Sequence, residues 1–209
     1  MIYYIADMHF GHANIIRHCG RPFDSVEEMD EAIIHNWNAR VNANDDVYIV
    51  GDFSYISKDA AEVAKRLKGR KTLIVGNHDL KNLKNSDFCA CFERIEKLLR
   101  IRDNGRDVVL CHYPIVEWDG YFRGAYHVYG HIHNARNNAF IVMRELDRAY
   151  NAGVDITGFR PVTLDELGEI NRRFCWGRES ASGQDMPVLT AGSGKIVREK
   201  YDFPSSHIR

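Results

Sequence analysis

Seven oxygen and nitrogen donors follow short apolar runs of this chain in a repeated arrangement. Each run ends at, or one glycine before, an aspartate, an asparagine or a histidine. The donors are Asp7, His9, Asp52, Asn77, His112, His131 and His133. Short apolar runs bounded by glycine predict buried strands, and ligands collect at the carboxyl ends of the strands in α/β sheets. The spacing therefore predicts a metal site assembled from several strand ends.

The number and type of these donors favour two metal ions. Taken alone each motif is weak: Asp7-x-His9 is short, Gly76 to Asp79 reads equally as a turn, and a single His112 is usually structural. Their order after five predicted strands argues against coincidence. A structural zinc ion is closed by four ligands, so seven donors imply two ions with room for water. Carboxylate, imidazole and amide donors suit manganese, iron, zinc, nickel or cobalt rather than calcium. We therefore expect a dinuclear hydrolytic centre.

The elements that would position these donors have local signals of their own. Ser25-x-x-Glu28 and Thr163-x-x-Glu166 are capping boxes, which predict helices through about Asn38 and Arg173. A second helix, 60–67, would be capped by Ser57 or Asp59. Asn104-Gly105 predicts a hairpin between strands 98–101 and 108–111. The sequence thus predicts one domain over residues 1–173 and an appended segment over 174–209, in which 188–189 and 196–197 could form a second hairpin.

The composition is that of an ordinary globular protein. Hydrophobic residues make up 44% and charged residues 27% of the 209 residues, with a net charge of -1. Nothing here directs the whole molecule toward nucleic acid or a membrane surface. The first residues lack the basic stretch of a signal peptide, and we expect a cytoplasmic protein with five reduced cysteines. Cys89-x-Cys91 reads either as half a zinc site or as a pair of packing residues.

The donor series resembles the signature of the calcineurin-like metallophosphoesterases. The blocks that carry the resemblance run from Asp7-x-His9 through Gly51-Asp52, Gly76-Asn77-His78-Asp79 and His112 to Gly130-His131-x-His133. The stretches 9–16 and 151–167 further resemble a small, cap-free bacterial and phage branch of that family. The resemblance implies an α/β fold, a four-layer α-β-β-α sandwich of the metallophosphoesterase type.

The resemblance also implies a role for each donor. One ion goes to Asp7, His9, Asp52 and His133, and the second to Asp52, Asn77, His112 and His131, with Asp52 bridging. The ions are two divalent transition metals, manganese or else iron, zinc, nickel or cobalt. A water shared by two such ions is acidified to a hydroxide that attacks phosphorus in line. His78 is expected to protonate the leaving oxygen, and Asp79 to fix the tautomer of His78.

Residues next to the donors are candidates for substrate binding. His12 leaves the same loop as His9, and Arg17 could hold a phosphate oxygen or else lie on the surface of a helix that starts near Ala13. Asn77 is expected to touch substrate as well as metal. The loops 19–23 and 118–123 either line the mouth of the site or pack on the domain. His18, His35, His127 and His207 are expected to be structural or exposed.

The predicted function is metal-dependent phosphoester hydrolysis, in particular phosphodiester hydrolysis on a small or nucleotide substrate. Short connections between the donor blocks leave no room for a cap domain over the site. One alternative is a nuclease or nucleic-acid end-processing phosphoesterase that uses the basic residues at 65–71, 94–106 and 172–178. Another is a non-catalytic protein-binding scaffold, which would be expected to have lost a donor. No membrane partner is expected, and the sequence leaves the oligomeric state open.

Overall fold

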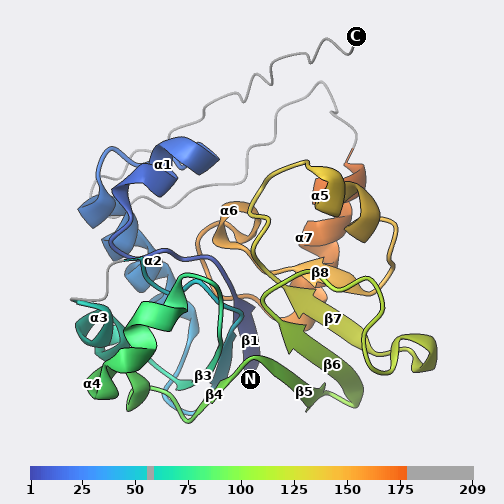
Figure 1. The fold of residues 1–209 in the computed structure, drawn as a ribbon, viewed down its shortest axis with the longest axis horizontal. Coiled ribbons are helices and arrows are strands. Elements are labelled where there is room, and N and C mark those ends of the chain that lie inside the picture. The colour runs from blue at the N-terminus through green and yellow to red at the C-terminus, as the bar shows by residue number, and fades with distance from the viewer. Residues whose placement is uncertain (56–58, 178–209) are drawn as a thin grey trace, which may run out of the picture.

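Two four-stranded sheets form the centre of the molecule (Figure 1). The computed structural model describes residues 1–55 and 59–177. In the first sheet all neighbouring strands are parallel, in the order β1 (Ile2–Ile5), β2 (Asp46–Ile49), β3 (Arg70–Ile74) and β4 (Arg94–Glu96). In the second, β5 pairs antiparallel with β6 and the rest are parallel, in the order β5 (Leu98–Asp103), β6 (Arg106–Cys111), β7 (Tyr126–Tyr129) and β8 (Ala149–Asn151).

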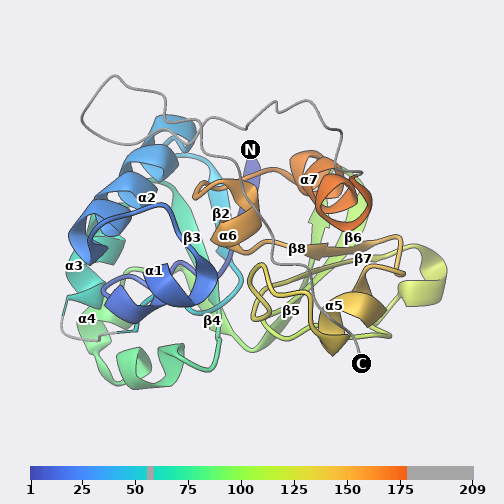
Figure 2. The ribbon, with the colours of Figure 1, turned by 90° about the horizontal axis from the view of Figure 1, so that it is seen from above.

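Helices cover the outer faces of both sheets, which makes the fold a four-layer α-β-β-α sandwich as predicted. On the first sheet lie α1 (Ala13–Cys19), α2 (Val26–Arg40), α3 (Ala60–Arg66) and α4 (Ser86–Cys89). On the second lie α5 (Asn138–Met143) and α7 (Leu164–Trp176), and α6 (Val154–Thr157) lies between the two outer groups in Figure 2. Two short 3-10 helices complete the described elements, η1 (Asp79–Lys84) and η2 (Tyr121–Arg123).

Three apolar clusters correspond to the three interfaces between these layers. Alternation along each strand separates them: Tyr3 and Ile5 pack toward the first helical layer, and Tyr4 and Ala6 pack between the sheets. Trp37 of α2 is fully buried in the first cluster, and Phe140 of α5 lies in the third. Both sheets are therefore anchored on two faces, which gives their strand ends fixed positions.

The predicted hairpin is present, and two of the predicted caps make their capping bonds. The Ser25 hydroxyl accepts from the backbone N–H of Glu28 at 3.1 Å, and Thr163 and Glu166 form a reciprocal capping box. Asn104 and Gly105 have φ values of 47° and 83°, the left-handed pair that a two-residue type I′ turn requires. Asp59 occupies the N-cap position of α3 without a capping bond from its side chain, and Ser57 lies outside the described residues.

The last described helix runs past its predicted end. α7 ends at Trp176 rather than near Arg173, and Phe174 packs against Phe140 with ring centroids 5.3 Å apart. The predicted boundary at 173/174 therefore falls inside a helix that belongs to the sandwich. Residues 178–209, including the predicted hairpin at 188–197, lie outside the described residues, so the appended segment stays a prediction. None of the described helices combines the length and the apolar character needed to cross a bilayer.

Candidate metal centre

The seven predicted donors converge where the carboxyl ends of the two sheets meet. The end of β1 is joined to the end of β8 by a hydrogen bond from the Ala6 N–H to the Ala152 carbonyl, 2.9 Å. The turn after β7 is tied to the turn after β1, because the His131 N–H donates to the Asp7 carboxylate at 3.0 Å. Donors that are up to 126 residues apart in the sequence, from Asp7 to His133, are thereby brought into one cluster.

Asp52 lies at the centre of the cluster. Its Oδ2 is 3.5 Å from His9 Nε2 and 3.4 Å from His112 Nε2. Ligand atoms at about 2.0–2.2 Å from a shared ion are separated by about 3–3.5 Å, so both spacings suit coordination. The other oxygen, Oδ1, accepts from the His78 backbone N–H at 2.9 Å, which fixes the orientation of the carboxylate. One Asp52 oxygen is therefore placed between two histidines that belong to different halves of the donor set.

The first half of the set contains Asp7, His9 and His133. One ligand atom from each lies within 4.8 Å of the others. His9 is almost fully buried, and neither of its ring nitrogens has a hydrogen-bond partner in the part of the chain that the structure describes. Burial lowers the pKa of His9 to about 2, so its ring is neutral with a free lone pair. A buried imidazole without a partner is costly, and a metal ion would satisfy it.

The second half contains Asn77, His112 and His131. Asn77 Oδ1 lies 3.1 Å from His112 Nε2 and 3.1 Å from His131 Nδ1. His112 Nδ1 is 3.0 Å from the Val50 carbonyl, which can only accept, so this nitrogen carries the proton. In the neutral ring Nε2 then presents a lone pair toward the oxygens of Asn77 and Asp52. A lone pair that faces two oxygens is unfavourable unless a metal ion or a second proton lies between these atoms. A histidine that binds metal through Nε2 and donates its Nδ1–H to a carbonyl has this arrangement.

Charges inside the centre favour a cation. Burial raises the pKa of Asp7 to about 6. Burial also opposes ionisation of Asp52, but hydrogen bonding and charge from His112 outweigh it and bring this pKa down to about 2. The pKa of His112 rises to about 8 against the effect of burial, because Asp52 and Asp7 stabilise its protonated form. Two buried carboxylates thus draw positive charge to this place, which protons provide when no metal is present.

The backbone of the centre is strained in a way that serves ligand placement. Five of the seven donors have a positive φ of 52–72°, a region that residues other than glycine rarely occupy: Asp7, His9, Asp52, His131 and His133. Such conformations cost of order 1–3 kcal/mol each and cluster at functional sites. The glycines before the donors are needed for space, since a Cβ at Gly51 would lie 2.2 Å from His112 Nδ1 and one at Gly76 2.3 Å from Asp52 Oδ1.

A buried ion pair that no sequence motif indicated supports the first half of the centre. Asp155 of α6 accepts from Arg21 at 2.8 Å, and its other oxygen lies 2.8 Å from His133 Nδ1. Arg21 also donates to the backbone carbonyls of Asp7 and Met8. These contacts leave His133 Nε2 free to face the cluster. The segment 151–167 carried a family resemblance, but no local signal joined Asp155 to Arg21, 134 residues away.

His78 and Asp79 lie beside the centre, but their predicted partnership is not found. His78 Nε2 is 4.0 Å from Asp52 Oδ2, and its side chain is 36% exposed, so it can reach a bound substrate. Asp79 was expected to orient the His78 ring. Instead its two oxygens accept backbone N–H groups of Asp52, Phe53 and Gly76 at 2.8–2.9 Å. Asp79 therefore braces the turn that carries Asp52, because the backbone after β2 offers unpaired N–H groups to it.

The predicted substrate residues differ in their placement. His12 precedes α1, and its ring centroid lies 5.4 Å from that of His9. Arg17 lies in the exposed last turn of α1, so its contact with substrate stays a prediction. Asn77 is exposed and has the position of a metal ligand described above. Two tyrosines that the sequence did not single out lie close by: the ring of Tyr55 is next to that of His78, and the ring of Tyr113 is next to that of the donor His131.

Of the two alternatives for the loops 19–23 and 118–123, the buried side chains of Arg21 and Trp118 favour packing on the domain. Arg21 in the loop 19–23 is buried in the ion pair with Asp155. The loop 118–123 directly precedes β7, whereas the donors follow it, so the loop lies at the opposite end of the second sheet. Trp118 is buried there and donates to the Ala125 carbonyl at 2.9 Å. The loop that follows a strand reaches the centre, and the loop that precedes it does not. The aromatic composition of 118–123 gives no information about which end of β7 this loop occupies.

The remaining described histidines have structural or surface positions. His127 is buried, lies 3.0 Å from the Val109 carbonyl and accepts from the Ile115 N–H, while His18 and His35 are exposed. His207 lies outside the described residues.

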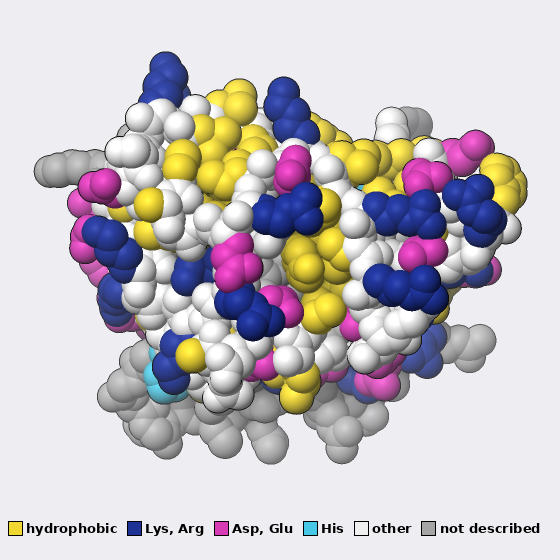
Figure 3. Space-filling view, turned by 90° about the horizontal axis from the view of Figure 1, so that it is seen from below, with side chains coloured by type: hydrophobic (Ala, Val, Ile, Leu, Met, Phe, Trp, Pro, Cys, Tyr) yellow, Lys and Arg dark blue, Asp and Glu magenta, His cyan; other side chains and the backbone are white. Residues whose placement is uncertain are grey.

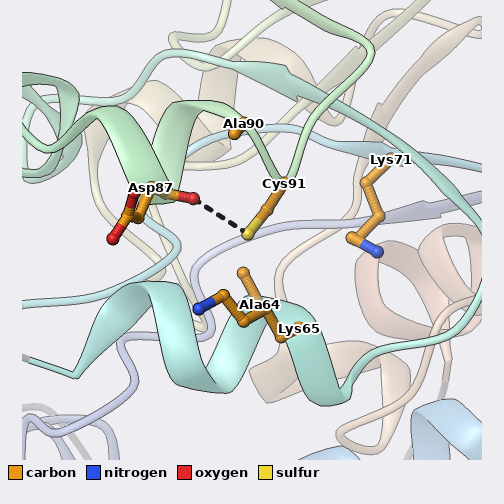
Figure 4. Close-up of a pocket in the computed structure, with 6 residues that line it drawn as sticks. All are labelled: Ala64, Lys65, Lys71, Asp87, Ala90 and Cys91. Carbon is orange, nitrogen blue, oxygen red and sulfur yellow. Dashed lines mark hydrogen bonds between the residues drawn. The ribbon is translucent and has the colours of Figure 1, made fainter.

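Cys91 lines a surface pocket between α3 and α4, where its thiol donates to the Asp87 carbonyl at 3.2 Å (Figure 4). Cys89 donates to the Leu83 carbonyl, so both thiols are engaged by backbone, as expected of packing residues.

The basic residues that suggested nucleic-acid binding are largely paired. Arg70, Arg94 and Arg106 begin β3, β4 and β6, at the ends of these strands opposite the donors. Each has a carboxylate partner, as do three further residues of the same clusters: the pairs are Arg70–Asp46, Arg94–Glu96, Arg106–Asp165, Lys65–Glu62, Arg66–Glu31 and Arg100–Asp107. Figure 3 shows basic and acidic side chains intermixed on the lower face. Among the described side chains visible in Figure 3, the basic ones do not form a continuous track.

Comparison with known proteins identifies relatives over most of the chain, although no family model matches it. The chain is 35% identical over 167 residues to the uncharacterized protein MJ1445 of Methanocaldococcus jannaschii, covering 78% of this chain and 87% of that protein. It is 30% identical over 199 residues to the gene 66 protein of Mycobacterium phage L5, covering 80% and 92%.

The fold has a relative among solved structures. The protein of unknown function AQ665 from Aquifex aeolicus superposes with a TM-score of 0.65 at 25% identity, over 81% of this chain and 98% of that one. The Pseudomonas putida nuclease MPE and YfcE, a phosphoesterase from E. coli, superpose with TM-scores of 0.43 and 0.35, too low to support an argument. On sequence identity and coverage, this chain belongs to the family of MJ1445 and the gene 66 protein of phage L5.

Proposed function

We propose that this protein is a metal-dependent phosphoester hydrolase of the calcineurin-like type, with two divalent transition-metal ions. The observation that carries the proposal is the position of Asp52 Oδ2, 3.5 Å from His9 Nε2 and 3.4 Å from His112 Nε2. A ligand that bridges two ions must lie between the two groups of residues that hold them, and Asp52 lies in that position. Manganese is the metal we propose first, and the mixed donors also suit iron, zinc, nickel and cobalt.

The residues have distinct tasks in this proposal. Bound ions would acidify a shared water and neutralise charge on the phosphoryl oxygens. Asp52 holds the two halves of the centre at a fixed separation. The Asp79 carboxylate accepts from the Asp52 backbone N–H and so keeps that backbone in place. As the P–O bond to the leaving arm breaks and one forms to the water oxygen, His78 passes a proton to the leaving oxygen. Water then returns a proton to His78.

The preferred substrate class is a phosphodiester with small or nucleotide arms. An alkoxide leaving group is basic and needs protonation, and His78 is both close to Asp52 and partly exposed. The pairing of the basic clusters with carboxylates, at the ends of the strands opposite the donors, makes a long nucleic acid a poorer fit. The intact donor set gives no support to a non-catalytic scaffold.

A substrate panel with the manganese-loaded protein tests the proposal. It should include aryl mono- and diesters, 2′,3′- and 3′,5′-cyclic nucleotides, dinucleoside polyphosphates and single-stranded oligonucleotides. We expect diester hydrolysis that a chelator abolishes and that falls at least about a thousandfold in Asp52→Asn. His35→Ala, which changes an exposed histidine of α2, should match the wild type. A metal-loaded protein that hydrolyses none of these esters would contradict the proposal and favour the scaffold.

A further inference from the structure

Two exposed tyrosines stand on the loops that directly follow metal donors. Tyr55 comes three residues after Asp52, and Tyr113 comes directly after His112. Each is 46% exposed, although tyrosines of the core such as Tyr4 are fully buried. Two exposed aromatic rings thus lie beside the centre, which a substrate made only of phosphate would not require.

Tyr55 is held beside the first half of the centre. Its ring stacks on that of His12, with centroids 3.8 Å apart and an angle of 10° between the planes. It also lies 5.4 Å from the ring of His78, the residue placed to protonate the leaving oxygen. Stacking on His12 fixes the plane of the tyrosine before any substrate arrives, which reduces the entropy lost on binding.

Tyr113 is held beside the second half. Its ring centroid lies 4.8 Å from that of His131 and 5.1 Å from that of His112, at steep angles of 64° and 72°. These edge contacts with two donor histidines orient the ring. Tyr113 therefore lies against two ligands of the second set, whereas Tyr55 lies near the first set through His12, whose ring is 5.4 Å from that of His9.

We infer that the two tyrosines bind the two organic arms of an aromatic phosphodiester, Tyr55 the leaving arm and Tyr113 the retained arm. The inference rests on the proposed function, because in-line displacement directs the leaving arm toward His78 and hence toward Tyr55. The retained arm then extends toward the other half of the centre. An aromatic wall on each side selects planar groups, either aryl rings or nucleobases, by stacking.

A pair of esters with the same leaving group tests the assignment of Tyr113. Bis(4-nitrophenyl) phosphate and methyl 4-nitrophenyl phosphate both release 4-nitrophenolate and differ only in the retained arm. Tyr113→Ala should lower kcat/KM about tenfold on the first ester and leave it within about twofold on the second. Tyr113→Phe should keep both activities, and Tyr113→Leu, which is apolar without a π face, should behave like the alanine variant.

The matching test for Tyr55 predicts a different pattern. Tyr55→Ala should lower kcat/KM on both esters by a similar factor, because both have an aryl leaving arm. Thymidine 5′-(4-nitrophenyl phosphate) distinguishes the two sources of the retained aromatic group: a larger loss in Tyr113→Ala on this ester than on the bis-aryl ester favours a nucleobase. Tyr121→Ala, which changes a tyrosine of η2 at the opposite end of the second sheet, is the control and should match the wild type.

Two results would overturn the inference, and they differ from failure of the proposed function. Equal losses on the two esters in Tyr113→Ala would mean that this ring does not bind the retained arm. Loss of metal from either alanine variant, measured by elemental analysis, would mean that the tyrosines support the ligands instead. If the metal-loaded wild-type protein hydrolyses neither ester nor any other phosphoester, the proposed function itself fails, and this inference with it.

Discussion

At the scale of single residues, His78 separates catalysis from metal binding. Its Nε2 lies 4.0 Å from Asp52 Oδ2. Within the described residues, no backbone carbonyl fixes its ring in the way that the Val50 carbonyl fixes His112. His78→Ala should keep the bound metal and lose about 10²–10⁴-fold in activity on alkyl or nucleotide diesters, whose leaving groups need a proton. The loss on 4-nitrophenyl esters should be distinctly smaller. Equal losses on both leaving-group classes would show that His78 stabilises the phosphoryl oxygens rather than acting as the acid.

Asp155 connects the buried Arg21 to His133, one of the proposed metal ligands. Asp155→Asn removes the charge that pairs with Arg21 and orients His133. Outer ligands of this kind are worth about 10–100-fold in metal affinity. We expect calorimetric titration with manganese to show one of two sites weakened by that factor and the other little changed. Asp165→Asn, which breaks an exposed pair with Arg106, is the matched control. Unchanged affinity at both sites would remove the assigned role.

At the scale of elements, the glycine after β2 determines how closely β2 and β6 can place their donors. Gly51 has φ 88°, and a Cβ there would lie 2.2 Å from His112 Nδ1. Gly51→Ala should therefore displace His112 and lower the metal content. Gly124→Ala is a matched control, because Gly124 has φ 86° and nothing within 4 Å of an added Cβ. Both variants carry the left-handed strain of about 1–2 kcal/mol, measurable by denaturant unfolding, but only Gly51→Ala should lose metal.

The strand ends show what the sequence could predict and what it could not. Asp7, Asp52 and His112 were predicted as donors because each follows its own apolar strand, which is a local signal. Arg21 and Asp155 were not paired, since 134 residues separate them and only the packing of α6 brings them together. Asp79 was assigned to its neighbour His78, but the free N–H groups of the turn after β2 attracted its carboxylate instead. Local patterns predicted the elements and the ligands, and tertiary contacts decided what supports them.

At the scale of the whole molecule, a partly buried carboxylate links the first helical layer to the ligand loop and makes stability depend on pH. Asp30 of α2 accepts from the Gly11 N–H at 2.9 Å, and burial raises its pKa to about 7. The ordinary value is about 3.9. Between these values the folded state keeps a proton that the unfolded state has lost, so stability should fall as pH rises from about 4 to about 7.

Asp30→Asn tests this dependence, because an amide can accept from Gly11 without a charge. The variant should be more stable than the wild type at pH 8, by on the order of 2 kcal/mol, and close to it at pH 4. Denaturant unfolding of the metal-free protein at both pH values measures the difference. Asp147→Asn, at an exposed position, should show no such change. A constant difference between Asp30→Asn and the wild type across this range would exclude Asp30 as the source.

The central claim is that Asp52 joins two metal ions in one site, and the metal content of purified variants tests it most directly. Elemental analysis of the wild type should find close to two transition-metal ions per chain. Asp52→Asn should lose more of that metal than any other single ligand change, because Asp52 alone lies between both groups of donors. His133→Ala and His131→Ala should each lose no more than one ion. Full metal content in Asp52→Asn, or a wild type that holds only one ion, would contradict the account.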